Sequence, residues 1–170
     1  MTPSENPSTS AAAPLGGRRW SLALAGLALT WLGLMAGVGL LAAPVLFALL
    51  DRALAGQVAG RLFALEAQGF TLLSVAMVLV VAAKAKRVAP AGQTPRMPTH
   101  LLWLLLALFC TVLGHHGLQP MMVKAKAGEA TPLSFGQLHG ISSSLFLVKA
   151  LALSAFAWVQ LRALSGRPQD

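Results

Sequence analysis

Four long apolar stretches constrain this chain more than any other feature. The first, from Trp20 to Leu50, contains no charged residue, and the others cover residues 62–83, 100–119 and 138–161. Each reaches the roughly 20 residues that an α-helix needs to cross a bilayer. A membrane β-strand needs only about 9–11 residues of alternating polarity, a pattern that none of the stretches sustains. The sequence therefore predicts an all-α fold, an integral membrane bundle of four transmembrane helices in an antiparallel, up-down arrangement.

The composition also favours a membrane protein. Hydrophobic residues make up 56% of the 170 residues and charged residues only 11%, less than half the charged share of an ordinary soluble domain. A core of this size cannot hide so much apolar surface, so membrane lipids are the expected partner. The net charge of +8 lies in short clusters between apolar runs rather than on one basic face, so nucleic acid is not an expected partner.

The start of the chain also has features of a signal peptide, because Arg18 and Arg19 precede an apolar run. That run is about twice as long as a signal-peptide core. The best small-residue cleavage site, Ala42-Ala43, is followed by Pro44, which hinders cleavage. We therefore expect an uncleaved first helix.

The polar segments set the predicted boundaries. Residues 1–18 are rich in Ser, Pro, Thr and Ala and predict a disordered cytoplasmic tail. Residues 51–62 predict either a helix lying in the membrane interface or a continuation of the first helix, and the prolines of residues 89–98 predict a loop. The predicted transmembrane domain is 19–164, with helices at about 20–50, 62–83, 100–119 and 138–161, followed by a tail at 165–170.

The basic residues predict the orientation, because Lys and Arg are more frequent in cytoplasmic loops. With four spans, the side that holds both termini and the central loop carries eight of them, against four on the other side. The bias places both termini in the cytoplasm, and the Ala-, Leu- and Arg-rich usage is typical of a bacterial inner membrane protein. The two groups are Arg18, Arg19, Lys84, Lys86, Arg87, Arg96, Arg162 and Arg167, against Arg52, Arg61, Lys124 and Lys126.

Small residues line one face of the first helix. Gly26, Thr30, Gly33 and Gly37 recur at spacings of three and four, which lets a second helix approach closely. We expect Gly26, Gly33 and Gly37 to pack against a helix of the same chain or of a second copy, so that a homo-oligomer is a candidate assembly.

Lys149 is the most informative residue in the fourth stretch. A lysine near the centre of a membrane helix costs about 2.5–3.5 kcal/mol on insertion scales, so it is expected to face a partner or a wet cavity. Steps of three and four residues join Lys149 to His139 and Ser142 in one direction, and to Phe156 and Gln160 in the other. This stripe is expected to face the interior of the bundle.

Glu66 is the predicted partner of Lys149. Rises of about 1.5 Å per residue place Glu66 about 6 Å and Lys149 about 13 Å below the outer surface, and a lysine side chain can span much of that difference. We expect the two charged groups to meet in the outer half of the bundle. The wider intramembrane polar cluster predicted there is Glu66, Gln68, His115, His116, Gln119, His139, Ser142 and Lys149.

Three interpretations of this cluster stay open. The polar groups satisfy one another and fix helix register, or they line a ligand or ion pathway. The third is a haem or copper site at His139 and His116, with His115, Met121 or Met122 nearby. Adjacent histidines point to different sides of a helix, and no HExxH, CxxC or CxxCH pattern accompanies them.

The sequence predicts no enzyme. No serine lies in a strand-turn-helix elbow, and the lone Cys110 lies inside an apolar run, where a cysteine usually packs as a small apolar residue. We expect no catalytic residues and no cofactor, with haem or copper as the alternative.

Short motifs along residues 20–162 resemble the transmembrane-protein-205-like family, whose bacterial members are mostly described as a domain of unknown function. His116 stands where that family's pattern favours Asn before Pro120, and Lys149 is not expected from it. The motifs are Trp31-Leu32-Gly33, Ala43-Pro44 with Phe47, Ala55-Gly56 and Leu62-Phe63, then Pro120-Met121, Phe135, Leu138-His139 and Ser142.

The resemblance implies a four-helix membrane protein without an assigned activity. A eukaryotic relative is associated with resistance to platinum drugs, and the family is distantly similar to CopD-type proteins, which use membrane histidines, with His139 as the first candidate here. We therefore expect a multi-pass inner-membrane protein that acts as a small transport or resistance factor. The alternative is a haem- or copper-binding redox protein that uses histidines on the outer side.

Overall fold

A computed structural model of the chain describes residues 15–88 and 98–165, and these residues form helices without a strand. The predicted tail at 1–14, the central loop at 89–97 and the end of the chain at 166–170 lie outside the described residues. The elements are α1 (Leu15–Ala36), η1 (Gly37–Ala42), α2 (Ala43–Leu49), α3 (Arg52–Val88), α4 (Thr99–Val112), η2 (Leu113–Leu118), α5 (Gln119–Lys126) and α6 (Phe135–Ser165).

The helices join into four spans that are long and apolar enough to cross a membrane within the described part of the chain: Arg18–Leu49, Arg52–Lys86, Thr99–Lys126 and Phe135–Ser165. Large apolar side chains such as Leu41, Leu72 and Leu151 are more than half exposed on the outside of the bundle, where lipid would cover them. The predicted all-α membrane fold is confirmed.

Two of the spans begin well before the residue that the sequence predicted. The first helix begins at Leu15 rather than Trp20, so the basic pair Arg18 and Arg19 lies within the helix. The second begins at Arg52 rather than Leu62. Residues 52–62 therefore form the first turns of α3 and do not continue the first helix.

Capping explains where α3 and α6 begin. The chain turns at Leu50, which is extended, and the Asp51 carboxylate accepts the backbone N–H of Leu54 at 2.9 Å, so Asp51 is the N-cap of α3. Ser134 and Gln137 form a reciprocal pair: the Gln137 side chain accepts the Ser134 N–H at 2.9 Å, and the Ser134 hydroxyl accepts the Gln137 N–H at 3.3 Å. This capping box starts α6.

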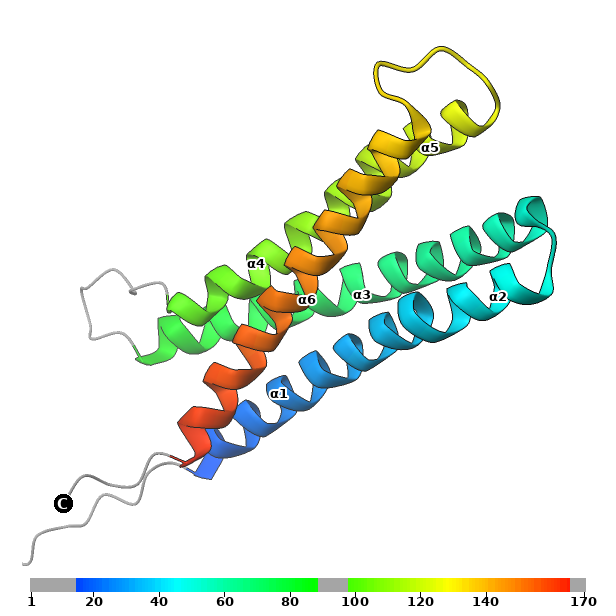
Figure 1. The fold of residues 1–170 in the computed structure, drawn as a ribbon. Helices are drawn as coiled ribbons and strands as arrows, with labels where there is room; N and C mark the ends of the chain where they lie inside the picture. The colour runs from blue at the N-terminus through cyan, green and yellow to red at the C-terminus, as the bar shows by residue number, and fades with distance from the viewer. Residues whose placement is uncertain (1–14, 89–97, 166–170) are drawn as a thin grey trace, which may run out of the picture.

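Figure 1 shows that α1 begins and α6 ends at the same end of the bundle, where α3 also ends and α4 begins. We call this the proximal end, and we call the opposite end, with the turn at 50–51 and the loop at 127–134, the distal end. Helix α6 packs against α1 and α4, and α3 packs against α4 and α2. In the distal half of the bundle, α6 lies beside α5, while α2 lies beside the first half of α3 (Figure 1).

The proximal half of the bundle has an apolar core. Leu24, Ala28, Trp31 and Met35 recur every three or four residues along α1 and are buried, which gives that helix one packed face. The facing helices add further apolar side chains to this core cluster, namely Met77, Val81, Leu101, Leu104, Ala107, Ala152, Leu153, Phe156 and Ala157.

Two wider π-helical turns interrupt the first and third spans. Each is followed by a proline in the first turn of the next helix, Pro44 in α2 and Pro120 in α5. The N–H of Ala43 donates to the Val38 carbonyl, and the N–H of Gln119 donates to the Gly114 carbonyl, five residues back instead of four. A proline ring clashes with the carbonyl four residues before it, and the wider winding relieves that clash.

The two hairpins, 15–88 and 99–165, repeat one pattern. The interval from Gly37 to Leu113, where the π-helical turns begin, equals the interval from Pro44 to Pro120. Shifting the buried residues of α1 by that interval reaches buried residues of α4 in every case except Leu24, which reaches the half-buried His100. The matched residues are Ala28 with Leu104, Trp31 with Ala107 and Met35 with Thr111.

The returning helices α3 and α6 repeat a motif as well. Leu62-Phe63 and Glu66 on α3 have the same spacing as Leu145-Phe146 and Lys149 on α6. Glu66 and Lys149 therefore occupy equivalent positions in the two hairpins, with opposite charge.

Candidate functional site: a buried ion pair between two hairpins

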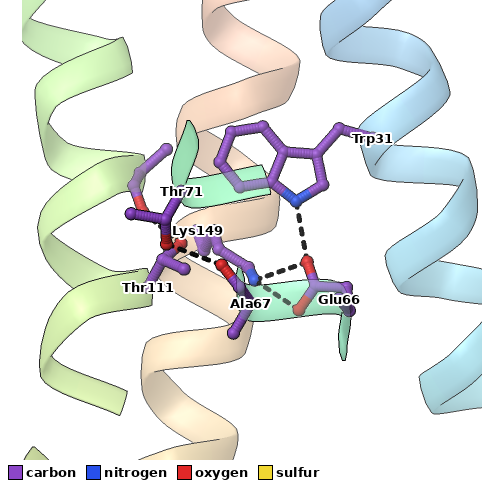
Figure 2. Close-up of polar contacts among 7 residues, drawn as sticks. Trp31, Glu66, Ala67, Thr71, Thr111 and Lys149 are labelled. Atoms are coloured by element: carbon purple, nitrogen blue, oxygen red, sulfur yellow. Dashed lines mark hydrogen bonds and ion pairs between the residues drawn. The ribbon is translucent and has the colours of Figure 1, made fainter. Parts of the chain in front are cut away.

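Lys149 and Glu66 form an ion pair in the interior of the bundle. The Lys149 ammonium donates to Glu66 Oε1 at 2.9 Å and to Oε2 at 3.1 Å, and both side chains are only 6% exposed. Figure 2 shows the two side chains pointing toward each other from α6 and α3. The predicted contact between these residues is confirmed.

Trp31 completes the site from α1. Its indole N–H donates to Glu66 Oε1 at 2.7 Å (Figure 2), and its ring stacks on Phe70 with 4.9 Å between centroids. Sequence reasoning did not assign Trp31 to the polar cluster. The signal was present, since a tryptophan in mid-span needs an acceptor for its N–H.

Aromatic faces cover the ammonium group. Lys149 Nζ lies 5.5 Å from the centre of the Trp31 ring and 6.0 Å from that of Phe146, within the range of cation–π attraction. Phe146 in turn meets the edge of Phe63 at 6.2 Å. Gly39 admits the Phe146 ring, because a Cβ at that position would lie 2.9 Å from Phe146 Cζ.

The prediction that one stripe of α6 faces inward is confirmed from Lys149 to Gln160 and is wrong at His139. Lys149, Phe156 and Gln160 are buried, but His139 is exposed. The interval from Leu138 to Lys149 is about three full turns, so Leu138 faces inward and is buried. His139 follows it and points about 100° away. Ser142 is half-buried.

A second set of polar side chains lies between the first and second hairpins. They lie where α3 faces η2 and α5. Gln68 and His115 approach to 3.4 Å. Nearer the distal end, a Cβ on Gly60 would lie 3.7 Å from the Gln119 amide nitrogen, and one on Gly56 would lie 3.1 Å from Lys126 Nζ. We call Gln68, His115, Gln119 and Lys126 the distal seam.

The proximal side of the pair differs. The hydroxyls of Thr71, Ser74 and Thr111 donate to carbonyls of their own helices, and Figure 2 shows the bond from Thr71 to the Ala67 carbonyl beside the pair. Apart from Gln160, the buried side chains beyond them are apolar. Packed apolar groups thus separate the ion pair from the proximal end.

The remaining histidines lie apart from the pair. His116 is exposed, with its ring 4.7 Å from that of His115, and His139 stacks on Phe135 at 6.0 Å. No group of three or more His, Cys, Asp or Glu residues in the described part of the chain has metal-site geometry. A metal or haem site at His116 and His139 stays a prediction that no contact among the described residues supports.

The predicted glycine face of the first helix does not pack within the chain. A Cβ added at Gly26, Gly33 or Gly37 would meet no atom within 4 Å. The face that α1 turns to the bundle is that of Ala28, Trp31 and Met35, because larger side chains bury more apolar surface there. Cys110 is buried, as expected of a packing residue.

Comparison with known proteins adds a family to this geometry. Residues 26–131 match the family described as a domain of unknown function, DUF4149, which covers more than half of the chain. The chain belongs to the DUF4149 family. The DUF4149 match includes Trp31, Glu66 and the distal seam, while Lys149 lies beyond it. No curated protein and no solved structure matches the chain.

Proposed function

We propose that this DUF4149 protein is a small transport or resistance factor of the bacterial inner membrane, and that Glu66 and Lys149 form its binding site. One observation carries the proposal: an ion pair buried between the two hairpins, with a polar seam on one side and an apolar core on the other. Ionisable residues inside a membrane mark ligand or ion pathways by default, because they are expensive to keep there.

A purely structural role for the pair is the competing explanation. The hairpins already bury Trp31, Leu104, Leu153 and Phe156 completely, so apolar packing alone can hold the helices together. A buried ion pair adds little stability compared with apolar residues of similar volume, since desolvation offsets the attraction. This comparison favours a role beyond holding the helices together.

The orientation that fits the proposal places the distal end outside the cell. Eight Lys and Arg residues belong to the side with the termini and the central loop, against four at the other side, which favours cytoplasmic termini. The distal seam would then lie in the periplasmic half of the bundle.

Survival assays test the proposal. The full chain would be expressed in a bacterium that is sensitive to toxic cations, and growth would be measured over dilutions of copper salts, cisplatin, ethidium and butylammonium. We expect the tolerated concentration of at least one compound to rise by about twofold or more. The double variant Glu66→Gln, Lys149→Met should accumulate equally in the membrane but give no protection. Equal growth with and without the wild-type chain for every compound would contradict the proposal.

The family resemblance gives a second candidate function, a haem- or copper-binding redox protein. The neighbouring rings of His115 and His116 are the feature that favours it, since imidazole ligates both iron and copper. Purification in mild detergent separates the two functions. A Soret band, or about one copper per chain, that is lost in the His115→Ala, His116→Ala or His139→Ala variant would favour the redox protein.

A further inference from the structure

We propose that Glu66, Trp31 and Phe146 form a recognition site for a small primary ammonium ion, and that the side chain of Lys149 occupies this site in the absence of ligand. The inference deepens the proposed function and rests on it, since it names the substrate class of the same site. The ligand replaces the Lys149 ammonium beside Glu66, and Lys149 gives up one proton in the exchange.

The groups around the Lys149 ammonium are those that recognise organic cations in general. One carboxylate contacts it through both oxygens, at 2.9 and 3.1 Å, and two aromatic rings lie 5.5 and 6.0 Å from it. Cation–π attraction strengthens when the site is desolvated, and both charged side chains here are nearly buried. A carboxylate with aromatic walls selects a cation that carries an apolar body.

Lys149 resembles a tethered ligand for the site. Its side chain is a four-carbon chain with a terminal ammonium, so the free molecule of the same chemistry is butylammonium. Glu66 does not depend on Lys149 for its orientation, because the Trp31 indole N–H holds Oε1 at 2.7 Å and Trp31 is fixed by stacking on Phe70. Removing Lys149 should therefore leave the carboxylate in place with its aromatic walls.

Charge balance determines the exchange step. Glu66 is the sole Asp or Glu between Arg52 and Gly128, so one carboxylate cannot balance two buried cations, and an unbalanced buried charge is costly. The ligand enters as R–NH3⁺ and pairs with Glu66, while Lys149 becomes a neutral amine. Its proton passes to water, so one cation enters the site for each proton released.

The surroundings of Lys149 offer no second partner for a displaced ammonium among the described residues. Glu66 faces it from α3 and Trp31 from α1. The other titratable groups close to the pair are Cys110 on α4 and His115 on η2, and neither is a carboxylate. Gln68 and His115 approach each other between α3 and η2 and likewise carry no carboxylate.

Binding of butylammonium to the purified full chain tests the inference. The chain has four tryptophans, and Trp20, Trp103 and Trp158 are exposed, so changing these three to Phe leaves Trp31 as the reporter. Trp31 fluorescence would be titrated in mild detergent with butylammonium chloride, against sodium chloride at equal ionic strength. We expect saturable binding in this background, binding at least about tenfold tighter in Lys149→Ala at pH 7, and none in Lys149→Ala, Glu66→Gln.

The pH dependence distinguishes exchange from simple binding. Release of one proton per ligand makes the dissociation constant of the Lys149-containing chain fall about tenfold for each unit rise in pH. A pH-independent constant in the Lys149-containing chain would overturn the proton exchange.

A rescue experiment covers the case in which Lys149→Ala does not fold. Purification with butylammonium should then restore a monodisperse protein, whereas 1-butanol, which has the same shape and no charge, should not. Equal binding to the variant without the Glu66 carboxylate, or failure of both titration and rescue, would overturn the inference. Protection in the survival assay without butylammonium binding would contradict this site alone, and binding without protection against any compound would contradict the proposed function alone.

Discussion

A lysine in mid-membrane needs an acceptor, and this chain contains five acidic residues in all. Of these, Glu66 alone lies deep within an apolar stretch, so the cost of leaving either charge unpaired predicts the pair. The structure adds what cost alone does not provide: the Trp31 donor and the Phe146 cover. The residue scale therefore determines which charges meet, while the environment of the pair depends on the packing of three helices.

Removing one charge of the ion pair should destabilise the protein more than removing both charges. Lys149→Met leaves the Glu66 carboxylate buried without a cation, and we expect it to lower the free energy of unfolding by about 3–5 kcal/mol. Adding Glu66→Gln should restore most of that loss, because the Gln side chain carries no charge and still accepts from Trp31. Thermal unfolding in mild detergent would show the order. A double variant as unstable as the single one would argue against a buried ion pair.

The indole donor can be tested separately. Trp31→Phe keeps a ring that stacks on Phe70 but removes the N–H that donates to Glu66. Hydrogen bonds to charged groups contribute about 1.5–3 kcal/mol, so the free energy of unfolding of the variant should fall by an amount in that range. Trp103→Phe is the matched control, because Trp103 is exposed and its replacement should cost less than about 0.5 kcal/mol. Equal free energies of unfolding of Trp31→Phe and Trp103→Phe would show that the Trp31 indole N–H does not stabilise the site.

At the scale of helices, the apolar runs predicted the four spans but did not predict the residue at which the second helix begins. The four spans follow from apolar runs, but α3 begins at Arg52 because the Asp51 side chain caps it. Residues 52–62 are less apolar than the rest of that span, so hydropathy placed the start at Leu62. With 37 residues, α3 is about 55 Å long, nearly twice the bilayer core of about 30 Å. Its first turns can therefore be polar and still helical.

The spacing of the glycines in the first span also failed to predict which glycine lies at a helix contact. Gly26, Gly33 and Gly37 fit a packing pattern, yet they face away from the bundle, while Gly39 meets Phe146. The reason is that Trp31 and Met35 determine which face of α1 is turned inward. A pattern of small residues shows that a close approach is sterically allowed and does not show that a helix makes it.

Substitution of two glycines in the first span tests this difference. Gly39→Leu places a side chain where the Phe146 ring lies, and overpacking of this kind costs about 1–3 kcal/mol. We expect a lower unfolding temperature and, because Phe146 covers Lys149, weaker butylammonium binding. Gly33→Leu on the exposed face is the control and should leave the unfolding temperature and butylammonium binding of the chain unchanged. If Gly33→Leu destabilises the protein as much, or breaks an oligomer, the exposed face contacts a second copy.

At the scale of the whole molecule, the two hairpins are unequal versions of one design. Each has a π-helical turn followed by a proline, and each returns with a Leu-Phe pair followed by a charged residue. The repeat was not predicted from the sequence, because short apolar motifs do not stand out in a chain that is 56% hydrophobic. It becomes visible once burial and the π-helical turns are known. Opposite charges at equivalent positions then meet between the two hairpins.

The orientation of this bundle in the membrane decides which side supplies the ligand, and the balance of basic residues predicts it. Lys84, Lys86 and Arg87 end the second span, and Arg96 follows in the central loop, so we expect that loop in the cytoplasm. Green fluorescent protein fused after Arg96 should fluoresce, and alkaline phosphatase fused after Ala130 should be active, since the one folds inside the cell and the other outside.

A charge-shift variant makes that test quantitative. Changing Lys84, Lys86 and Arg87 to Gln removes three of the eight basic residues on the termini side. The remaining excess over the four on the other side is small, so both reporters should give mixed signals. The matched variant with Arg61 and Lys124 changed to Gln should strengthen the original orientation. Phosphatase activity after Arg96 in the unmodified chain would reverse the assignment, and the distal seam would then lie on the cytoplasmic side instead of the outside.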